Sequence, residues 1–202
     1  MYNFDGEVDR GGEMNIQRIS ESTGASNGTH EHLGYLRAFA DACMLNPPYD
    51  GHVIVDLFAR MCPWGTIRND LNPQFLEEGF TTHALDAIAL LKTMEMGSAD
   101  IILLDPPFSD RMNQDKYENV GRASLYTDPR YMSELGDEIG RVLRAGGVVV
   151  KAGFNSNRPS KNLELSSLYI SHYAASRNDV LFSVWLQSQT RLQFLNTTVD
   201  LI

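Results

Sequence analysis

The segment Asp105-Pro106-Pro107-Phe108 combines residue types that can bind a planar amino group. Its two prolines carry no backbone N–H, so the segment offers carbonyl oxygens and one carboxylate as hydrogen-bond acceptors. An aromatic amine is a poor nucleophile because its lone pair is delocalised into the ring. Acceptors that hold both N–H hydrogens would localise that lone pair toward an electrophile, and Phe108 could stack on the base. The segment therefore indicates chemistry at an exocyclic amino nitrogen such as that of adenine.

The predicted position of this segment supports that interpretation. The apolar run at 100–104 predicts a buried strand, which places Asp105 at the carboxyl end of a parallel sheet, where ligands of such folds bind. No Ser or Cys nucleophile with a neighbouring base lies nearby, as covalent catalysis would need. The electrophile is therefore expected to be a strong methyl donor, for which a sulfonium methyl is the natural choice.

Elements that would position this segment follow from the hydrophobic pattern. The alternation of apolar runs with helical spacing predicts an α/β fold with a mostly parallel seven-stranded sheet and an antiparallel C-terminal hairpin. Helices are expected over 29–45, 128–145 and 162–176. Strands are expected over 52–57, 65–69, 80–84, 100–104, 148–152, 180–186 and 191–195, of which the last two would form the hairpin.

A second segment, Asn46-Pro47-Pro48-Tyr49, has the same pattern of residue types. It follows a helical pattern and precedes the first strand expected in the sheet, whereas the chemistry requires acceptors at the carboxyl end of a strand. We therefore interpret it as the stop of a helix.

Composition limits the classes of function. The 202 residues suit one domain over 29–202, preceded by a polar, irregular arm over 1–28. A net charge of −9 argues against broad phosphate neutralisation, so any nucleic-acid contact must use a local basic patch. Only two cysteines occur and no ligand spacing is present, so no metal site is expected. With no long apolar run, we expect no membrane segment and a cytoplasmic location.

Asp105-Pro-Pro-Phe108 resembles the (Asp/Asn)-Pro-Pro-(Tyr/Phe) motif of amino methyltransferases that make N6-methyladenine or N4-methylcytosine, and Val55-Asp-Leu-Phe-Ala59 is similar to their cofactor motif. Small phage and bacterial adenine-methylase-like proteins are the most similar type. The resemblance implies a Rossmann-like class I methyltransferase fold, S-adenosyl-L-methionine as cofactor, and a nucleic-acid substrate, DNA before RNA. The residues it assigns to the cofactor are Asp56, Leu57, Phe58, Ala59, Asp70 and Asp86.

Departures from the family pattern keep alternatives open. The family's Phe-x-Gly-x-Gly has Arg60 and Cys62 at its two glycine positions, and Leu57 and Thr66 are too close in sequence to enclose a crossover helix. A short turn is expected there instead. A protein-glutamine methyltransferase remains an alternative because a side-chain amide presents a similar planar NH2 group. A noncatalytic binding module derived from this fold is the other alternative.

Overall fold

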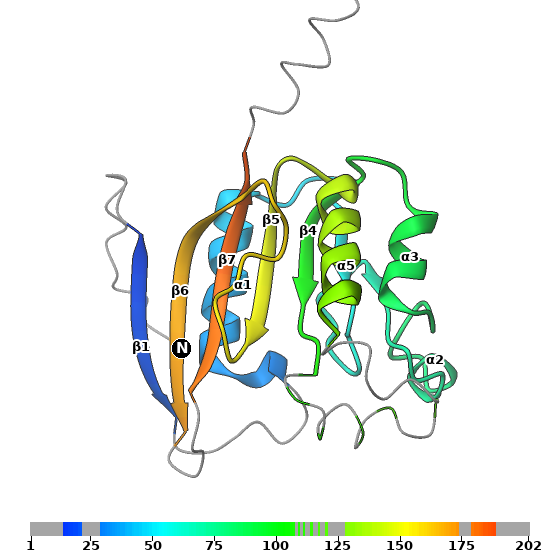
Figure 1. The fold of residues 1–202 in the computed structure, drawn as a ribbon, viewed down its shortest axis with the longest axis horizontal. Coiled ribbons are helices and arrows are strands. Elements are labelled where there is room, and N and C mark those ends of the chain that lie inside the picture. The colour runs from blue at the N-terminus through cyan, green and yellow to red at the C-terminus, as the bar shows by residue number, and fades with distance from the viewer. Residues whose placement is uncertain are drawn as a thin grey trace, which may run out of the picture.

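The computed structural model describes residues 14–21, 29–107, 109, 111, 114, 117, 120, 128–173 and 179–188. Within these residues, seven strands form one sheet in the order β1-β6-β7-β5-β4-β2-β3 (Figure 1). The strands are β1 (Asn15–Glu21), β2 (Ile54–Asp56), β3 (Ile67–Arg68), β4 (Ala99–Leu104), β5 (Leu143–Gly153), β6 (Leu163–Tyr173) and β7 (Val180–Gln187). The helices are η1 (Thr29–Glu31), α1 (Leu33–Leu45), α2 (Gln74–Glu77), α3 (Ala87–Thr93) and α5 (Pro129–Val142).

The sheet is parallel except for β7, which is antiparallel to both of its neighbours, β5 and β6. This arrangement confirms the predicted α/β fold with a mostly parallel sheet and an antiparallel hairpin. The hairpin, however, consists of β6 and β7, and the strand predicted over 191–195 lies outside the described residues. The carboxyl ends of β4 and β5 lie at the lower edge of the sheet in Figure 1, and β2 ends at the same edge because it is parallel to β4.

Two hydrophobic clusters hold the helices on opposite faces of the sheet. Helix α1 packs behind β5, β6 and β7, whereas α5 lies in front of the sheet beside β4, with α3 packed against α5 (Figure 1). Every residue of β4 is buried, as expected for a central parallel strand covered on both faces. Helix α5 begins at an N-cap, because the Asp128 carboxylate accepts a hydrogen bond from the Arg130 backbone N–H at 2.8 Å and Pro129 occupies the first turn.

Three predicted elements differ in the structure. The prediction of a helix over 162–176 is wrong, because Leu163–Tyr173 is strand β6. Its pairing with β7 shifts register between Leu165 and Ser167, and the buried positions beyond the shift include Ser167 and Ser171. The bulge and the buried serines interrupt the apolar alternation that identifies a strand. In addition, helix α5 ends at Val142, and β5 begins at once rather than after Gly146-Gly147.

The chain start and the third predicted strand also differ. Residues 15–21 form β1, parallel to β6, where an irregular arm is predicted; the rest of 1–28, apart from residue 14, lies outside the described residues. Among residues 15–20, whose burial the structure describes, only Ile19 is buried, so the sequence of this strand carries no clear alternation. The strand predicted over 80–84 is reduced to one parallel bridge between His83 and Asn69.

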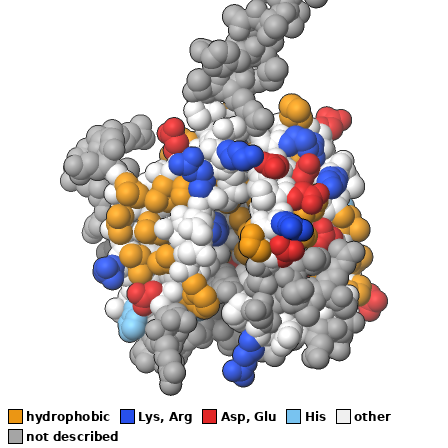
Figure 2. All heavy atoms as spheres, viewed as in Figure 1, with side chains coloured by type: hydrophobic (Ala, Val, Ile, Leu, Met, Phe, Trp, Pro, Cys, Tyr) orange, Lys and Arg blue, Asp and Glu red, His pale blue; other side chains and the backbone are white. Residues whose placement is uncertain are grey.

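The connection between β5 and β6 runs over 154–162 without a helix. It lies close against α5, because a Cβ atom at Gly136 would stand 2.5 Å from the Pro159 carbonyl oxygen. Lys151 anchors its start by donating hydrogen bonds to Asn155 Oδ1 at 2.9 Å and to the Asn157 carbonyl at 2.8 Å. The absence of a crossover helix leaves hydrophobic side chains over β1 and β6 at the surface (Figure 2), among them Ile16 with 53% exposure.

Candidate functional site

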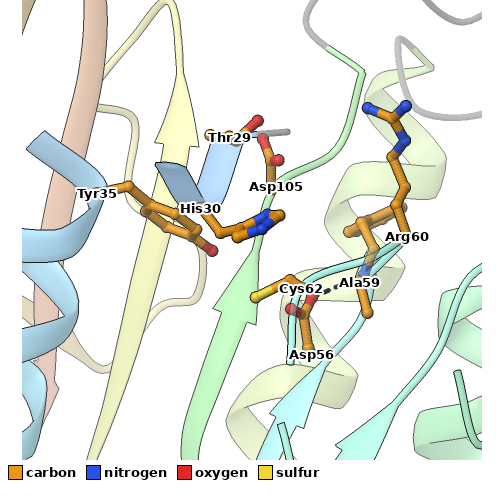
Figure 3. Close-up of a pocket in the computed structure, with 9 residues that line it drawn as sticks. Thr29, His30, Tyr35, Asp56, Ala59, Arg60, Cys62 and Asp105 are labelled. Atoms are coloured by element: carbon orange, nitrogen blue, oxygen red, sulfur yellow. Dashed lines mark hydrogen bonds between the residues drawn. The ribbon is translucent and has the colours of Figure 1, made fainter. Parts of the chain in front are cut away.

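Asp56 and Asp105 line one small hollow, with a cavity volume of about 10 Å³, at the carboxyl edge of the sheet (Figure 3). Asp56 is the last residue of β2, and Asp105 directly follows β4, the neighbouring parallel strand. Because the two strands end side by side, the predicted catalytic and cofactor segments are brought together. The remaining lining residues are Thr29, His30, Tyr35, Phe58, Ala59, Arg60 and Cys62.

The predicted catalytic segment after β4 contains a buried Pro-Pro unit. Pro106 and Pro107 are buried, and Asp105 is half-buried at the border of the hollow. A buried Pro-Pro unit fixes the backbone that carries the Asp105 carboxyl group. Phe108, the predicted stacking residue, lies outside the described residues.

Asp56 is a buried acid with 2% exposure. Its carboxyl group accepts hydrogen bonds from the Phe58 backbone N–H at 3.2 Å and from the Cys62 thiol. Burial raises the pKa of Asp56 to about 7, and the nearby carboxyl groups of Asp105 and Asp70 act in the same direction. A cation in the hollow would favour the ionised form of Asp56, so the hollow suits a positively charged group.

The turn between β2 and β3 replaces a crossover helix, as the sequence predicts. The Cys62 backbone N–H donates to the Ala59 carbonyl at 2.7 Å, and Arg60 within this turn has a φ of 47°. This left-handed conformation favours glycine, which the family pattern has at this position, and Arg60 adopts it with a side chain. The guanidinium group points away from Asp56 (Figure 3) and lies 5.9 Å from the centre of the Phe75 ring. Arg60 therefore borders the hollow, with its guanidinium group directed away from Asp56.

Asp70, predicted to bind the cofactor's ribose, is fully buried after β3. Its carboxylate accepts hydrogen bonds from the Asn72 backbone N–H at 2.9 Å and from the Tyr117 hydroxyl at 3.3 Å. Burial raises the pKa of Asp70, against the opposing effect of these two bonds and of Arg60. Asp70 is near enough to Asp56 to raise its pKa, but it does not line the hollow.

Asp86, predicted to contact the cofactor's adenine, is the N-cap of α3. Its Oδ1 accepts hydrogen bonds from the Ile88 and Ala89 backbone N–H groups, and its Oδ2 accepts one from the Tyr131 hydroxyl at 2.8 Å. Leu57 does not line the hollow either, since its side chain packs in the core. Of the predicted cofactor residues, the structure thus brings Asp56, Phe58 and Ala59 to the hollow.

Sequence reasoning missed two residues that shape this edge. Asn69 joins three segments, because its amide group donates to the Leu57 and Leu85 carbonyls and accepts from the Leu85 backbone N–H. A polar residue at the end of a predicted strand, here the one expected over 65–69, is the signal that could have found it. Tyr35 lines the hollow from α1, and its sequence position gives no such signal.

Glycine at position 34 sets the position of Tyr35. A Cβ atom there would lie 2.4 Å from Ser171 Oγ and 2.5 Å from Phe182 Cδ2, so only glycine lets α1 approach the β6–β7 hairpin this closely. The Tyr35 ring then packs against the rings of Trp64 and Phe182, with centroids 5.4 and 5.5 Å away. The close approach of α1 therefore directs the Tyr35 hydroxyl into the hollow.

Within the described ranges, no group of three or more His, Cys, Asp or Glu side chains could hold a metal ion. No helix in the described part of the chain has the length and apolar character needed to cross a membrane.

No family model and no curated protein matches this sequence. Among solved structures, the chain is similar to yhhF of Escherichia coli, a candidate methyltransferase, with a TM-score of 0.46 and 11% identity over 76% of this chain and 85% of that one. A candidate methylase from Haemophilus influenzae has a TM-score of 0.46 and 13% identity, with 76% and 96% of the two chains covered. A methyltransferase homologue from Pyrococcus horikoshii has a TM-score of 0.46 and 13% identity, with 83% and 73% covered. Because these TM-scores are below 0.5, the proposed function is argued from the residues of this chain alone.

Proposed function

We propose that this chain is an S-adenosylmethionine-dependent methyltransferase that acts on an exocyclic amino nitrogen, with adenine N6 in DNA as the first candidate. One observation carries the proposal: Asp56 and Asp105 end adjacent parallel strands and line the same hollow. The proposed chemistry requires the two acids to lie close together, and the sequence alone does not show whether they do. Cytosine N4 and RNA are variants of the same chemistry.

The cofactor would be held at its methionine end by residues of the hollow. Asp56 would bind the α-ammonium group, and Phe58 and Ala59 would border the aliphatic part. The bound cofactor supplies an electrophilic methyl group. The acids suit the charge of such a ligand, because a buried carboxylate beside a second acid is stabilised by a cation. The hollow has a cavity volume of about 10 Å³, so it would have to widen to admit the ligand.

Asp105 would orient the substrate. Its carboxylate accepts a hydrogen bond from the amino group, and the prolines that follow contribute no competing N–H donor. The buried Pro106-Pro107 unit keeps this acceptor in place, so little reorganisation accompanies the reaction. The chain's role is thus to position the planar NH2 group and to shield it from water.

A noncatalytic binding module is the second candidate, and specific contacts favour it. The two acids assigned to the ribose and the adenine of the cofactor already accept hydrogen bonds from tyrosine hydroxyls, Asp70 from Tyr117 and Asp86 from Tyr131. A ligand that uses these acids must replace those bonds.

Two measurements test the proposal in sequence. Isothermal titration calorimetry with S-adenosylmethionine at pH 8 should show binding, since Asp56 is mostly ionised there. Transfer of a radiolabelled methyl group to DNA, RNA and protein acceptors should then yield labelled N6-methyladenine in nucleic acid. Binding without transfer to any acceptor would favour the noncatalytic module, and label on glutamine amides would move the substrate class to protein.

A further inference from the structure

A groove lies between helix α5 and the connection that joins β5 to β6. Its cavity volume is about 310 Å³, and it shares no described lining residue with the hollow. Helix α5 and the connection both lie in front of the sheet in Figure 1. The volume is at the lower end of the range for ligand pockets, so the groove can admit a small molecule or one unit of a longer chain.

Two glycines of α5 bring the walls of the groove together. A Cβ atom at Gly136 would meet the backbone of the connection, and one at Gly140 would lie 2.6 Å from Ser160 Oγ. On the opposite wall, Arg158 Nη1 donates a hydrogen bond to the Lys161 carbonyl oxygen at 3.0 Å. The fold therefore holds both walls in contact and fixes one end of the Arg158 guanidinium group.

The groove is positively charged, although the protein carries a net charge of −9. Among the described residues that line it, Arg158 and Lys161 are the cations and Asp137 is the one acid. Lys161 Nζ lies 3.2 Å from Asp137 Oδ1, and the two side chains are 82% and 60% exposed. An ion pair this exposed contributes little to stability, so a ligand can replace it at little cost.

The other acids of α5 have basic partners outside the groove. Glu134 pairs with Lys92 at 2.6 Å, and Glu138 pairs with Arg141 at 2.7 Å. None of these four residues lines the groove. Helix α5 therefore carries three acids but leaves only Asp137 to oppose an anion there.

The connection starts at the edge of the sheet that carries Asp105. Lys151 of β5 pairs with Leu104 of β4, the residue before Asp105, and the connection follows the end of β5 at Gly153. A nucleic-acid strand whose target base lies at Asp105 can therefore continue along the connection toward Arg158. An acidic protein needs a local basic patch for such a contact.

The lining of the groove indicates the chemistry of its ligand. A guanidinium group and an ammonium group bind phosphate oxygens, and the hydroxyl groups of Ser133 and Ser160 add neutral donors. Met132 and Pro159 give the groove an apolar part that suits a sugar. We propose that this groove binds a phosphodiester unit of the nucleic-acid substrate, with Arg158 and Lys161 on the phosphate oxygens. This inference rests on the proposed function, in which the substrate is a nucleic acid.

Fluorescence anisotropy with a labelled single-stranded DNA of about 16 nucleotides tests the inference. Arg158→Gln and Lys161→Gln should each lower the slope of log affinity against log salt concentration by about 0.7, because each removes one phosphate contact. The same loss should weaken the affinity about 5-fold at about 0.1 M salt. The matched control is Lys92→Gln, which removes the same charge from an exposed ion pair outside the groove. It should change neither the slope nor the affinity.

Asp137→Asn supplies a readout of opposite sign. It removes the acid that competes with the ligand for Lys161, so the affinity for DNA should rise. A merely structural ion pair between Asp137 and Lys161 predicts the same DNA affinity in both variants as in wild type. Thermal unfolding of each variant checks that it is folded.

A glutamate peptide with the same net charge as the DNA tests whether the groove recognises phosphodiesters. Wild type should bind the DNA more tightly, and equal affinity for the peptide would overturn the inference because the groove would then recognise charge alone. The inference is also overturned if wild type binds no DNA, or if Arg158→Gln and Lys161→Gln bind DNA no more weakly than Lys92→Gln does.

Methyl transfer separates this inference from the proposed function. If wild type methylates DNA while the groove variants keep its DNA affinity and salt dependence, the inference fails and the proposed function stands. If DNA binding depends on the groove but no labelled methyl group reaches nucleic acid, the inference stands and the proposed function fails.

Discussion

An aspartate and an Asx-Pro-Pro segment lie at each end of strand β4, but the polar groups at the two ends differ in whether the fold gives them hydrogen-bond partners. At the amino end, Asp100 is 1% exposed and accepts hydrogen bonds from the Tyr49 hydroxyl at 3.0 Å and the Val53 backbone N–H at 2.7 Å. Arg144 Nε lies 2.5 Å from its Oδ1. Asn46 ends α1 and donates to the Asp100 carbonyl at 3.1 Å. Here the polar groups bind one another and fasten α1 to the sheet.

At the carboxyl end, the acids Asp56 and Asp105 face a hollow, and the Tyr35 hydroxyl has no partner. The letters of a short motif therefore do not distinguish a structural corner from a candidate binding site. What separates them is whether the fold itself satisfies the polar groups. The Asn46-Pro47-Pro48-Tyr49 segment was predicted to be a helix stop, and Asn46 is the C-cap of α1.

The largest effect is expected from Asp105→Ala. It removes the acceptor that orients the amino group, so the single-turnover rate of methyl transfer should fall by about 10²–10³-fold, the range found for loss of one oriented polar group. Asp105→Asn keeps an acceptor oxygen and should retain more activity than Asp105→Ala. Equal single-turnover rates in wild type and Asp105→Ala would show that Asp105 does not take part in methyl transfer.

Asp100→Ala tests the other end. It leaves Arg144 and the Val53 N–H without their buried acceptor, so the free energy of unfolding should fall by about 2–3 kcal/mol in urea denaturation. Affinity for S-adenosylmethionine, measured on folded protein, should not change. A loss of affinity as large as that expected for Asp56→Asn would contradict a purely structural role for Asp100.

The pH dependence of binding sharpens the comparison further. Because the pKa of Asp56 is about 7, affinity for a cationic ligand should fall about tenfold for each pH unit below 7. The folded-state pKa lies above the unfolded value, so without ligand the stability should decrease as pH rises from about 4 to 7. Asp56→Asn should weaken binding above pH 7 and abolish both pH trends. Calorimetry and denaturation across this range check them.

The smallest effect is expected from Arg60→Gly. Glycine relieves a left-handed conformation that costs an L-residue about 1–2 kcal/mol, and it adds unfolded-state entropy worth about 0.5–1 kcal/mol. The free energy of unfolding should therefore change by no more than about 1 kcal/mol. Affinity for S-adenosylmethionine should stay the same, because the guanidinium group points away from Asp56. A large gain in affinity would show that Arg60 restricts the hollow.

Local signals predicted the part of the site that lies on the strands. The sequence predicts β4 because an uninterrupted apolar run leads directly to Asp105, whereas its position between β2 and β5 is known only from the structure. The prediction failed for β6, where a bulge and buried serines interrupt the alternation. Tyr35 could not be predicted, because its role depends on how closely α1 approaches the sheet at Gly34, a distance that no pattern within α1 encodes.

The edge position of β1 has a consequence for synthesis. Asn15 pairs with Ser167, so about 150 residues must be translated after β1 before its partner exists. At typical elongation rates this delay is roughly 10–30 s. During that time β1 is open to pairing with other chains. Its Ile16 side chain remains half-exposed even in the folded state. Synthesis of the β6–β7 hairpin therefore decides when β1 becomes protected.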